Sequence, residues 1–157
     1  MQVVSNTSPI IFLSKIDALD LLPQCFEKIF IPQAVVNELH NLSLPNYIER
    51  SSLSIAGSNF ALGATMTSNL HIGELEAMVL AQEIQADYVI LDDRLARRKA
   101  QHLGLKVIGT IGVLLLAHKR QLITAPEIEE YLAALTQTHG MYISPKILKQ
   151  VKMSLQK

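Results

Sequence analysis

Short apolar segments alternate with helical patterns along this chain, and this alternation constrains the fold more than any other feature. The clearest example begins at Gly73, where a helical pattern over residues 74–85 precedes an apolar run over 87–91. A polar helical pattern over 94–103 and a second apolar run over 106–108 follow. Short strands that are apolar at consecutive positions are typical of parallel sheets covered on both faces. The sequence therefore predicts an α/β fold with a parallel sheet between helices.

The N-terminal part predicts units of the same kind. Residues 3–4 indicate the end of a short buried strand, and the polar residues after them predict a helix with Ser8 as its N-cap and Pro9 as its first residue. The run 28–31 indicates a second strand, after which Pro32 can open another helix.

Two stretches interrupt or extend this alternation. Residues 43–71 are rich in Ser, Asn, Gly and Leu with poor periodicity, and they predict a variable excursion with a possible strand at 53–56. At the other end, Thr124 with a glutamate three residues later forms a capping box for a helix to about residue 138. Ser144, followed by proline, opens a last helix.

Length and hydropathy favour one globular unit. The chain has 157 residues, 49% of them hydrophobic, with a mean hydropathy of +0.25, so we expect a single domain with a core over about 1–123 and C-terminal helices over about 125–157. The longest apolar run, 107–117, is interrupted by glycine and threonine and is shorter than the ~20 residues of a membrane span. There is no basic leader segment and Cys25 is the only cysteine, so a cytoplasmic location is expected.

The formal net charge of zero conceals a division of charge along the chain. Residues 1–93 carry 11 acidic and three basic residues, a net charge of −8, whereas residues 94–157 carry three acidic and 11 basic residues, a net charge of +8. Such asymmetry within one compact domain predicts a cation site beside an anion-binding surface.

Oxygen-bearing side chains follow the predicted strands. Asn6 comes after the first strand and Asp92 and Asp93 after a later one, while Glu38 and Glu74 lie at helix ends. Loops at the carboxyl ends of parallel strands converge over a crevice, and oxygen ligands grouped there suit Mg²⁺ or Mn²⁺. Zinc is not expected, because one cysteine and five scattered histidines show no ligand spacing.

Each of these acidic or amide residues also has a purely structural explanation. Asn6 is a common turn or cap residue, and Glu38 could be a solvated helical carboxylate. Glu74 could complement a helix macrodipole, which is also the simplest explanation of Glu76. The adjacent aspartates at 92–93 could simply form a turn.

The basic residues likewise allow two explanations. Those that follow the acidic pair lie on one predicted helix, where they could guide phosphates or form a solvated face. These residues are Arg94, Arg97, Arg98 and Lys99. The lysines at 146, 149 and 152 fit a solvated face. Residues 109–112 lack the glycine spacing of a nucleotide-binding fingerprint, so no nucleotide cofactor is expected.

Five segments together carry a family resemblance. They read Val-Val-Ser-Asn-Thr-Ser-Pro-Ile at 3–10, Ile-Pro-Gln-Ala-Val-Val-Asn-Glu-Leu at 31–39, Gly-Glu-Leu-Glu-Ala at 73–77, Leu-Asp-Asp-Arg at 91–94 and Gly-Thr-Ile-Gly-Val-Leu-Leu-Leu at 109–116. In this order, over about residues 1–123, the chain resembles PIN-domain proteins, especially the prokaryotic branch related to the toxin nucleases of toxin–antitoxin pairs. The resemblance implies a three-layer α/β/α sandwich with a parallel, doubly wound central sheet.

The same resemblance implies a function and partners. It implies an endoribonuclease that depends on Mg²⁺ or Mn²⁺, forms a homodimer and is held inactive by an antitoxin protein. The alternative is a catalytically inactive PIN-like module that binds RNA or an antitoxin. A receiver-type signalling domain fits less well, because the acidic pair of that family follows the first strand rather than lying at 92–93.

Carried over position by position, the resemblance assigns site residues. The catalytic, metal-binding cluster falls on Asn6, Glu38, Glu74 and Asp92, with Asp93 as a further metal ligand. Asn6 stands where the family normally has aspartate. The asparagine keeps a carbonyl oxygen but lacks the negative charge of aspartate. For the substrate, Thr7 and Ser8 could hold a water or a phosphate oxygen, and Arg94, Arg97 and Arg98 could contact phosphates.

Overall fold

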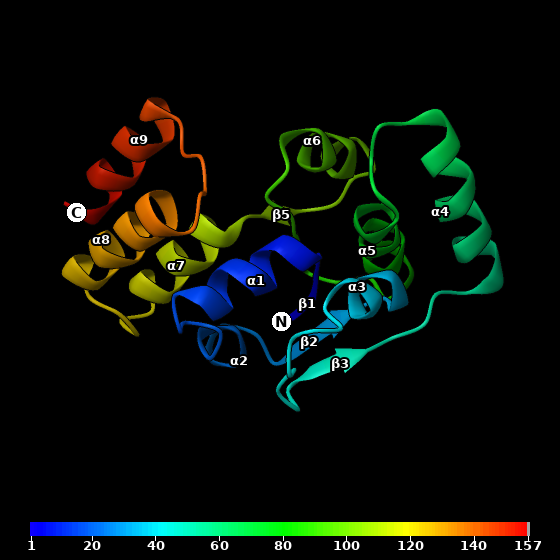
Figure 1. The fold of residues 1–157 in the computed structure, drawn as a ribbon, viewed down its shortest axis with the longest axis horizontal. Helices are drawn as coiled ribbons and strands as arrows, with labels where there is room; N and C mark the ends of the chain where they lie inside the picture. The colour runs from blue at the N-terminus through cyan, green and yellow to red at the C-terminus, as the bar shows by residue number, and fades with distance from the viewer. Residues whose placement is uncertain (157) are drawn as a thin grey trace.

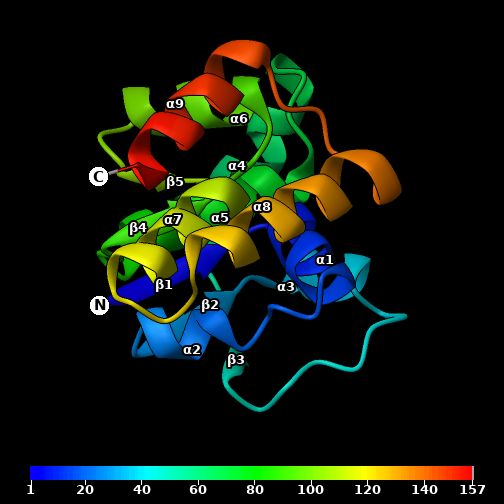
Figure 2. The same ribbon diagram turned by 90° about the vertical axis from the view of Figure 1, so that its left-hand side faces the viewer.

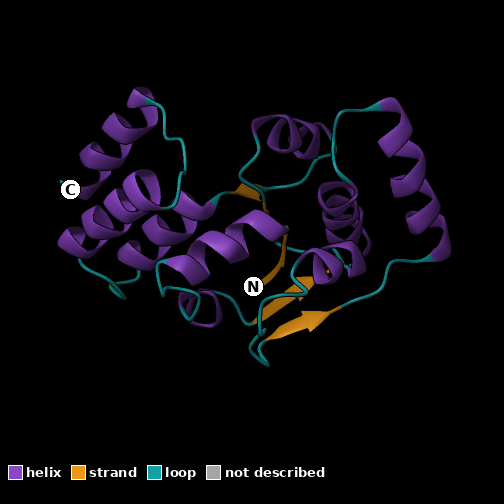
Figure 3. Ribbon diagram, in the orientation of Figure 1, coloured by secondary structure: helices purple, strands orange, loops and turns teal. Residues whose placement is uncertain are grey.

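The computed structural model describes residues 1–156 and contains a five-stranded parallel sheet in the order β3-β2-β1-β4-β5. The strands are β1 (Gln2–Ser5), β2 (Lys28–Ile31), β3 (Ile48–Arg50), β4 (Tyr88–Ile90) and β5 (Val107–Ile108). The chain winds outward from β1 in one direction through β2 and β3 and then returns to β4 on the other side. This reversal makes the sheet doubly wound (Figures 1 and 3).

Helices cover both faces of the sheet. Successive strand residues point to opposite sides, so each strand contributes apolar side chains to both faces. Val3 and Ile90 belong to one core cluster, whereas Val4 and Val89 belong to another. The first cluster includes residues of α1 (Thr7–Lys15), α2 (Leu21–Cys25) and α7 (Thr110–Lys119), and the second those of α5 (Ile72–Glu83) and α6 (Arg94–His102). The result is the three-layer α/β/α sandwich that the resemblance implies.

The remaining helices extend these layers. The short α3 (Gln33–Glu38) follows β2 and contacts α5, and α4 (Ile55–Thr67) packs on the outer side of α5 (Figure 1). At the C-terminus, α8 (Ala125–Ala133), the π-helical turn η1 (Ala134–Thr138) and α9 (Pro145–Leu155) lie beyond α7 (Figures 1 and 2). Their buried residues Ile128, Leu135 and Val151 join the same core cluster as Val3.

Most predicted elements are present, but two local predictions are wrong. Helix α1 begins at Thr7 rather than at Pro9, because Asn6 leaves the sheet with its backbone N–H bound to the Ile90 carbonyl and takes the N-cap position itself. No strand lies at 53–56. The stretch predicted as a variable excursion instead contains β3 and α4, and Ser54 is the N-cap of α4, where its side chain accepts a hydrogen bond from the Gly57 backbone N–H.

The C-terminal helix starts were predicted correctly. The capping box of Thr124 and Glu127 opens α8, and Ser144 caps α9. Among residues 1–156, no helix is both long and apolar enough to cross a bilayer.

Candidate active site

A pocket of about 210 Å³ lies where the sheet winding reverses, at the carboxyl ends of the central strands. Four chain segments contribute to it: the β1–α1 junction, the end of α3, the start of α5 and the start of α6. The residues that line it are Asn6, Thr7, Ser8, Glu38, His71, Glu74 and Asp93.

Gly73 allows two of these oxygens to approach the start of α5. A Cβ atom at this position would lie 2.5 Å from Glu38 Oε1 and 3.4 Å from Asn6 Oδ1. Any larger residue would displace the Glu38 carboxylate. Gly73 is therefore required by a close approach rather than by an unusual backbone conformation.

Asn6 occupies the N-cap position of α1, but its side chain makes no capping hydrogen bond. The ordinary explanation of such a residue, a cap, therefore does not account for its side chain here. Its Oδ1 atom lies on the Gly73 side of the pocket instead. The amide oxygen is available to a ligand in the pocket.

Glu74 is the buried carboxylate of the pocket, with 6% of its surface exposed. Burial raises the pKa of Glu74 above its ordinary value, the hydrogen bond from the His71 backbone N–H opposes this rise, and the charges of Asp93 and Glu38 add to it. Its Oε1 atom accepts that hydrogen bond at 3.0 Å and so closes the first turn of α5. Three carboxylates thus share one small pocket and repel one another.

Thr7 adds an unsatisfied polar atom. Its side chain is 7% exposed and its Oγ1 atom is buried without a hydrogen-bond partner among the described residues. A buried hydroxyl left in this state costs about 1–3 kcal/mol. Because Thr7 lines the pocket, a ligand there could satisfy this atom.

Asp92 and Asp93 are adjacent in sequence but lie in different environments. Asp92 Oδ1 accepts the Thr110 backbone N–H at 2.8 Å, and Asp92 Oδ2 accepts the Thr110 hydroxyl at 2.6 Å. Both oxygens of Asp92 therefore hold the start of α7, and this residue is not part of the pocket lining. Asp93 does line the pocket, while its Oδ2 atom accepts the Ala96 backbone N–H at 2.9 Å and caps α6.

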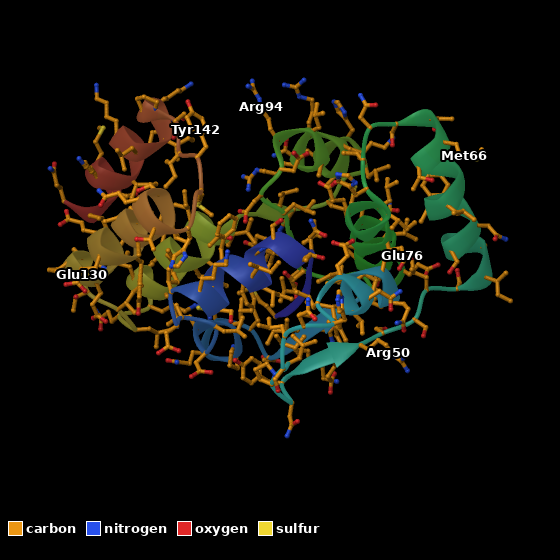
Figure 4. The ribbon with its side chains drawn as sticks, in the orientation of Figure 1. Arg50, Met66, Glu76, Arg94, Glu130 and Tyr142 are labelled. Carbon is orange, nitrogen blue, oxygen red and sulfur yellow. The ribbon has the colours of Figure 1, made fainter. Side chains whose placement is uncertain are left out.

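Two further residues position the site from outside. Glu76 accepts a hydrogen bond from the Ala34 backbone N–H at 3.0 Å, although the sequence suggested it only as a helix-terminal charge (Figure 4). This bond joins α5 to the start of α3, whose last residue is Glu38. Arg97 Nη1 donates to the Leu91 carbonyl at 3.0 Å, so its guanidinium supports the loop before Asp92. Of the three predicted phosphate-binding arginines, Arg94 and Arg98 are exposed and Arg97 is half-buried.

His71 is the pocket residue that sequence reasoning missed. Histidine spacing gave no signal, because His71 contributes alone from the N-cap of α5. The usable signal was its place two residues before the Gly73-Glu74 pair.

The donors of the pocket fit a hard divalent cation. Asn6, Glu38, Glu74 and Asp93 line the pocket and carry amide and carboxylate oxygens. Mg²⁺ or Mn²⁺ takes only one or two carboxylates directly while keeping several waters. Among residues 1–156, no group of three or more His, Cys, Asp or Glu side chains is arranged so that it could hold a metal ion. Water molecules would therefore supply part of the coordination in this arrangement.

Comparison with known proteins agrees with this fold. The DUF3368 family model, described as PIN domain, matches residues 2–157, and the chain belongs to this family. PIN domains are usually nucleases and generally depend on divalent metals.

The comparisons with solved structures and with curated proteins are less informative. One solved structure that matches is a PilT N-terminus domain protein, SSO1118, from the hyperthermophilic archaeon Sulfolobus solfataricus P2, at 18% identity and a TM-score of 0.45. That match covers 91% of this chain and 100% of the other. A comparison with curated proteins yields no match.

Proposed function

We propose that this protein is an endoribonuclease that hydrolyses RNA phosphodiester bonds with Mg²⁺ or Mn²⁺. The observation that carries the proposal is the convergence of Asn6, Glu38, Glu74 and Asp93 on one pocket at the reversal point of the sheet. Family membership supports the same chemistry.

In this proposal the four pocket residues hold the cation, and Asp92 contributes by fixing α7 behind them. A bound divalent cation supplies Lewis-acid polarisation of the phosphate and lowers the pKa of an attacking water. Glu38 and Asp93 provide the negative charge that attracts the cation. The buried Glu74 is the carboxylate whose ionisation gains most from a cation nearby, because burial and its neighbours oppose that ionisation.

The chain's own residues would also orient the substrate. Thr7 and Ser8 lie at the N-terminus of α1 and line the pocket, where their hydroxyls could donate to a phosphate oxygen or hold a water. The orphaned Oγ1 atom of Thr7 supports this role, because a bound ligand would satisfy it.

Asn6 favours one alternative function. Without a carboxylate at this position the attraction for a divalent cation is weaker, so the chain could instead bind RNA or a protein without cutting. The decisive assay incubates RNA with Mn²⁺ and either the natural chain or an Asn6→Asp variant. Cleavage by the natural chain excludes the binding module. No cleavage by either folded protein contradicts the nuclease proposal.

A homodimer is part of the proposal, and α4 is its best-supported surface. The side of α4 that meets α5 is formed by Gly57 and Ala61, while Ile55 and Met66 are each 85% exposed and Leu62 is 62% exposed (Figure 4 shows Met66). Residues 51–70 contain no charged side chain, so two copies could meet here without charge repulsion. Burying these exposed apolar side chains against a second copy would give a small interface of the weak class.

The dimer can be tested by measuring the mass of the protein in solution. Sedimentation over a range of concentrations should show a monomer–dimer equilibrium that Met66→Lys shifts towards the monomer. A strictly monomeric natural chain would contradict this part of the proposal.

The cellular role that we propose is that of a cytoplasmic toxin neutralised by an antitoxin protein. Its support is the resemblance to the toxin-type branch together with the proposed nuclease site. Expression should arrest bacterial growth, a Glu38→Gln variant should not, and co-expression of the neighbouring gene should restore growth. Growth arrest by both proteins would mean that the toxicity does not come from this pocket.

A further inference from the structure

A basic surface lies beside the pocket, on two helices that are distant in sequence. Helix α6 exposes Arg94, Arg98 and Lys99, and α9 exposes three lysines. The α9 lysines are Lys146, Lys149 and Lys152. Figure 1 shows α6 and α9 on the same side of the molecule, and Figure 2, in which both again lie at the top, agrees.

These cations are not neutralised by the protein itself. The only salt bridge among residues 1–156 joins the Met1 amino group to Glu27. The exposed basic residues of α6 and α9 make no salt bridge within this part of the chain, so anions can approach them. Two basic helices on one side of the fold form a surface for an extended polyanion rather than for a single small anion.

The surface begins at the pocket. Arg94 is the first residue of α6 and directly follows Asp93, which lines the pocket and caps that helix. A phosphodiester chain that leaves the pocket at Asp93 would therefore meet the start of α6 first.

An exposed aromatic residue lies between the two helices. Tyr142 is 84% exposed in the loop before α9, and Figure 4 shows it on the side of α9 that faces α6, with Arg94 at the top of α6. Its neighbours Met141 and Ile143 pack against the core, and the Met141 backbone N–H binds the Leu135 carbonyl at 2.9 Å. The loop is thus anchored on both sides of Tyr142, and the fold does not use this ring.

We infer that single-stranded RNA runs from the pocket across α6 to α9, with its phosphates on the basic residues and one base stacked on Tyr142. An aromatic ring beside a basic groove is the usual combination for single strands, because only unpaired bases expose their faces for stacking. This inference rests on the proposed function and adds the path of the substrate and the base-stacking role of Tyr142.

The test measures binding apart from cleavage. Fluorescence anisotropy of a labelled single-stranded RNA in EDTA gives Kd for the full chain, for Tyr142→Ala and for Tyr142→Phe. We expect Tyr142→Ala to raise Kd about tenfold and Tyr142→Phe to leave it unchanged, because stacking needs the ring and not the hydroxyl. Wild-type affinity of Tyr142→Ala overturns the inference.

Charge variants test the second half of the path. Lys146→Glu with Lys149→Glu should weaken binding at least tenfold and lower the slope of log Kd against log salt by about 1.4, as expected for two lost phosphate contacts. The matched control is Lys15→Glu with Lys28→Glu, which makes the same charge change at the end of α1 and the start of β2, away from α6 and α9. Equal effects of the two pairs overturn the inference.

Two competitors and a cleavage assay complete the test. Duplex RNA and polyglutamate should compete poorly with the single strand, and equal competition by either would assign the surface to duplexes or to acidic proteins. Cleavage with Mn²⁺ is measured separately. RNA that is bound through Tyr142 but never cut contradicts the proposed function alone, whereas cleavage with binding unaffected by Tyr142→Ala contradicts this inference alone.

Discussion

Replacing Gly73 with alanine should separate activity from stability at this site. The new Cβ atom would lie 2.5 Å from Glu38 Oε1, whereas an ordinary contact begins at about 3.4 Å. The Glu38 carboxylate must therefore withdraw by about 0.9 Å. This shift is sterically cheap, because the displaced atom ends a flexible, exposed side chain.

The consequence for catalysis is large because site groups must be held accurately. A displacement of about 1 Å in such a constellation can lower the rate about 100-fold. We therefore expect Gly73→Ala to cleave RNA with Mn²⁺ about 100-fold more slowly than the natural chain, and to need a higher Mn²⁺ concentration for half-maximal rate. The free energy of unfolding should stay within about 1 kcal/mol, because alanine suits a helix better than glycine.

Gly63 in α4 offers the matched control, since a Cβ atom there would meet nothing within 4 Å. Gly63→Ala should add up to about 1 kcal/mol of stability and leave cleavage unchanged. Both quantities come from initial rates on one labelled RNA and from urea denaturation. If Gly73→Ala cleaves RNA as fast as the natural chain, the Glu38 carboxylate is not held at a catalytic position and the reasoning fails.

Other residues of the site yield three further predictions. Asp92→Asn replaces the carboxylate that accepts two hydrogen bonds from Thr110, and it should lower the free energy of unfolding by about 2 kcal/mol. Urea denaturation measures this loss, and an unchanged midpoint would contradict the role of Asp92 in holding α7. The pKa of Glu74 is raised in the folded protein. Its contribution to stability is therefore complete below the pKa that it has in the unfolded chain, and it is lost as the pH rises through the pKa that it has in the folded chain. As the pH rises above the ordinary pKa of a glutamate, the melting temperature of Glu74→Gln should therefore gain on that of the natural chain, and parallel curves would refute this. In EDTA, Asn6→Asp should melt at a lower temperature than the natural chain, because it adds a fourth carboxylate to the pocket. With Mn²⁺, its melting temperature should rise more than that of the natural chain. Equal rises would contradict metal binding at Asn6.

Periodicity and chain punctuation predicted the strands and helices wherever local signals were strong. The apolar run before Asp92 and the capping box at Thr124 each correspond to an observed element. The segment at 53–56 was misjudged because its alternating apolar residues imitate a strand, whereas the Ser54 cap and packing against α5 produce a helix.

The candidate site was predicted as a set of residues but not as an arrangement. Sequence order could not show that Asp92 and Asp93, one residue apart, face different partners, because this depends on where the start of α7 lies in space. Glu76 gave no sign of its contact with α3, and the only signal for His71 was its place before the Gly73-Glu74 pair. The position of Tyr142 relative to α6 likewise depends on the tertiary structure, which places α9 on the same side of the molecule as α6 (Figure 1).

The central claim is that the pocket holds a divalent cation, and anomalous diffraction from crystals grown with Mn²⁺ tests it most directly. The account predicts a strong anomalous peak within coordinating distance of Glu38 and of at least one of Asn6, Glu74 and Asp93. The same crystals of Glu38→Gln should show a weaker peak. A peak elsewhere, or none at saturating Mn²⁺ in well-ordered crystals, would contradict the metal centre and the hydrolytic mechanism proposed with it.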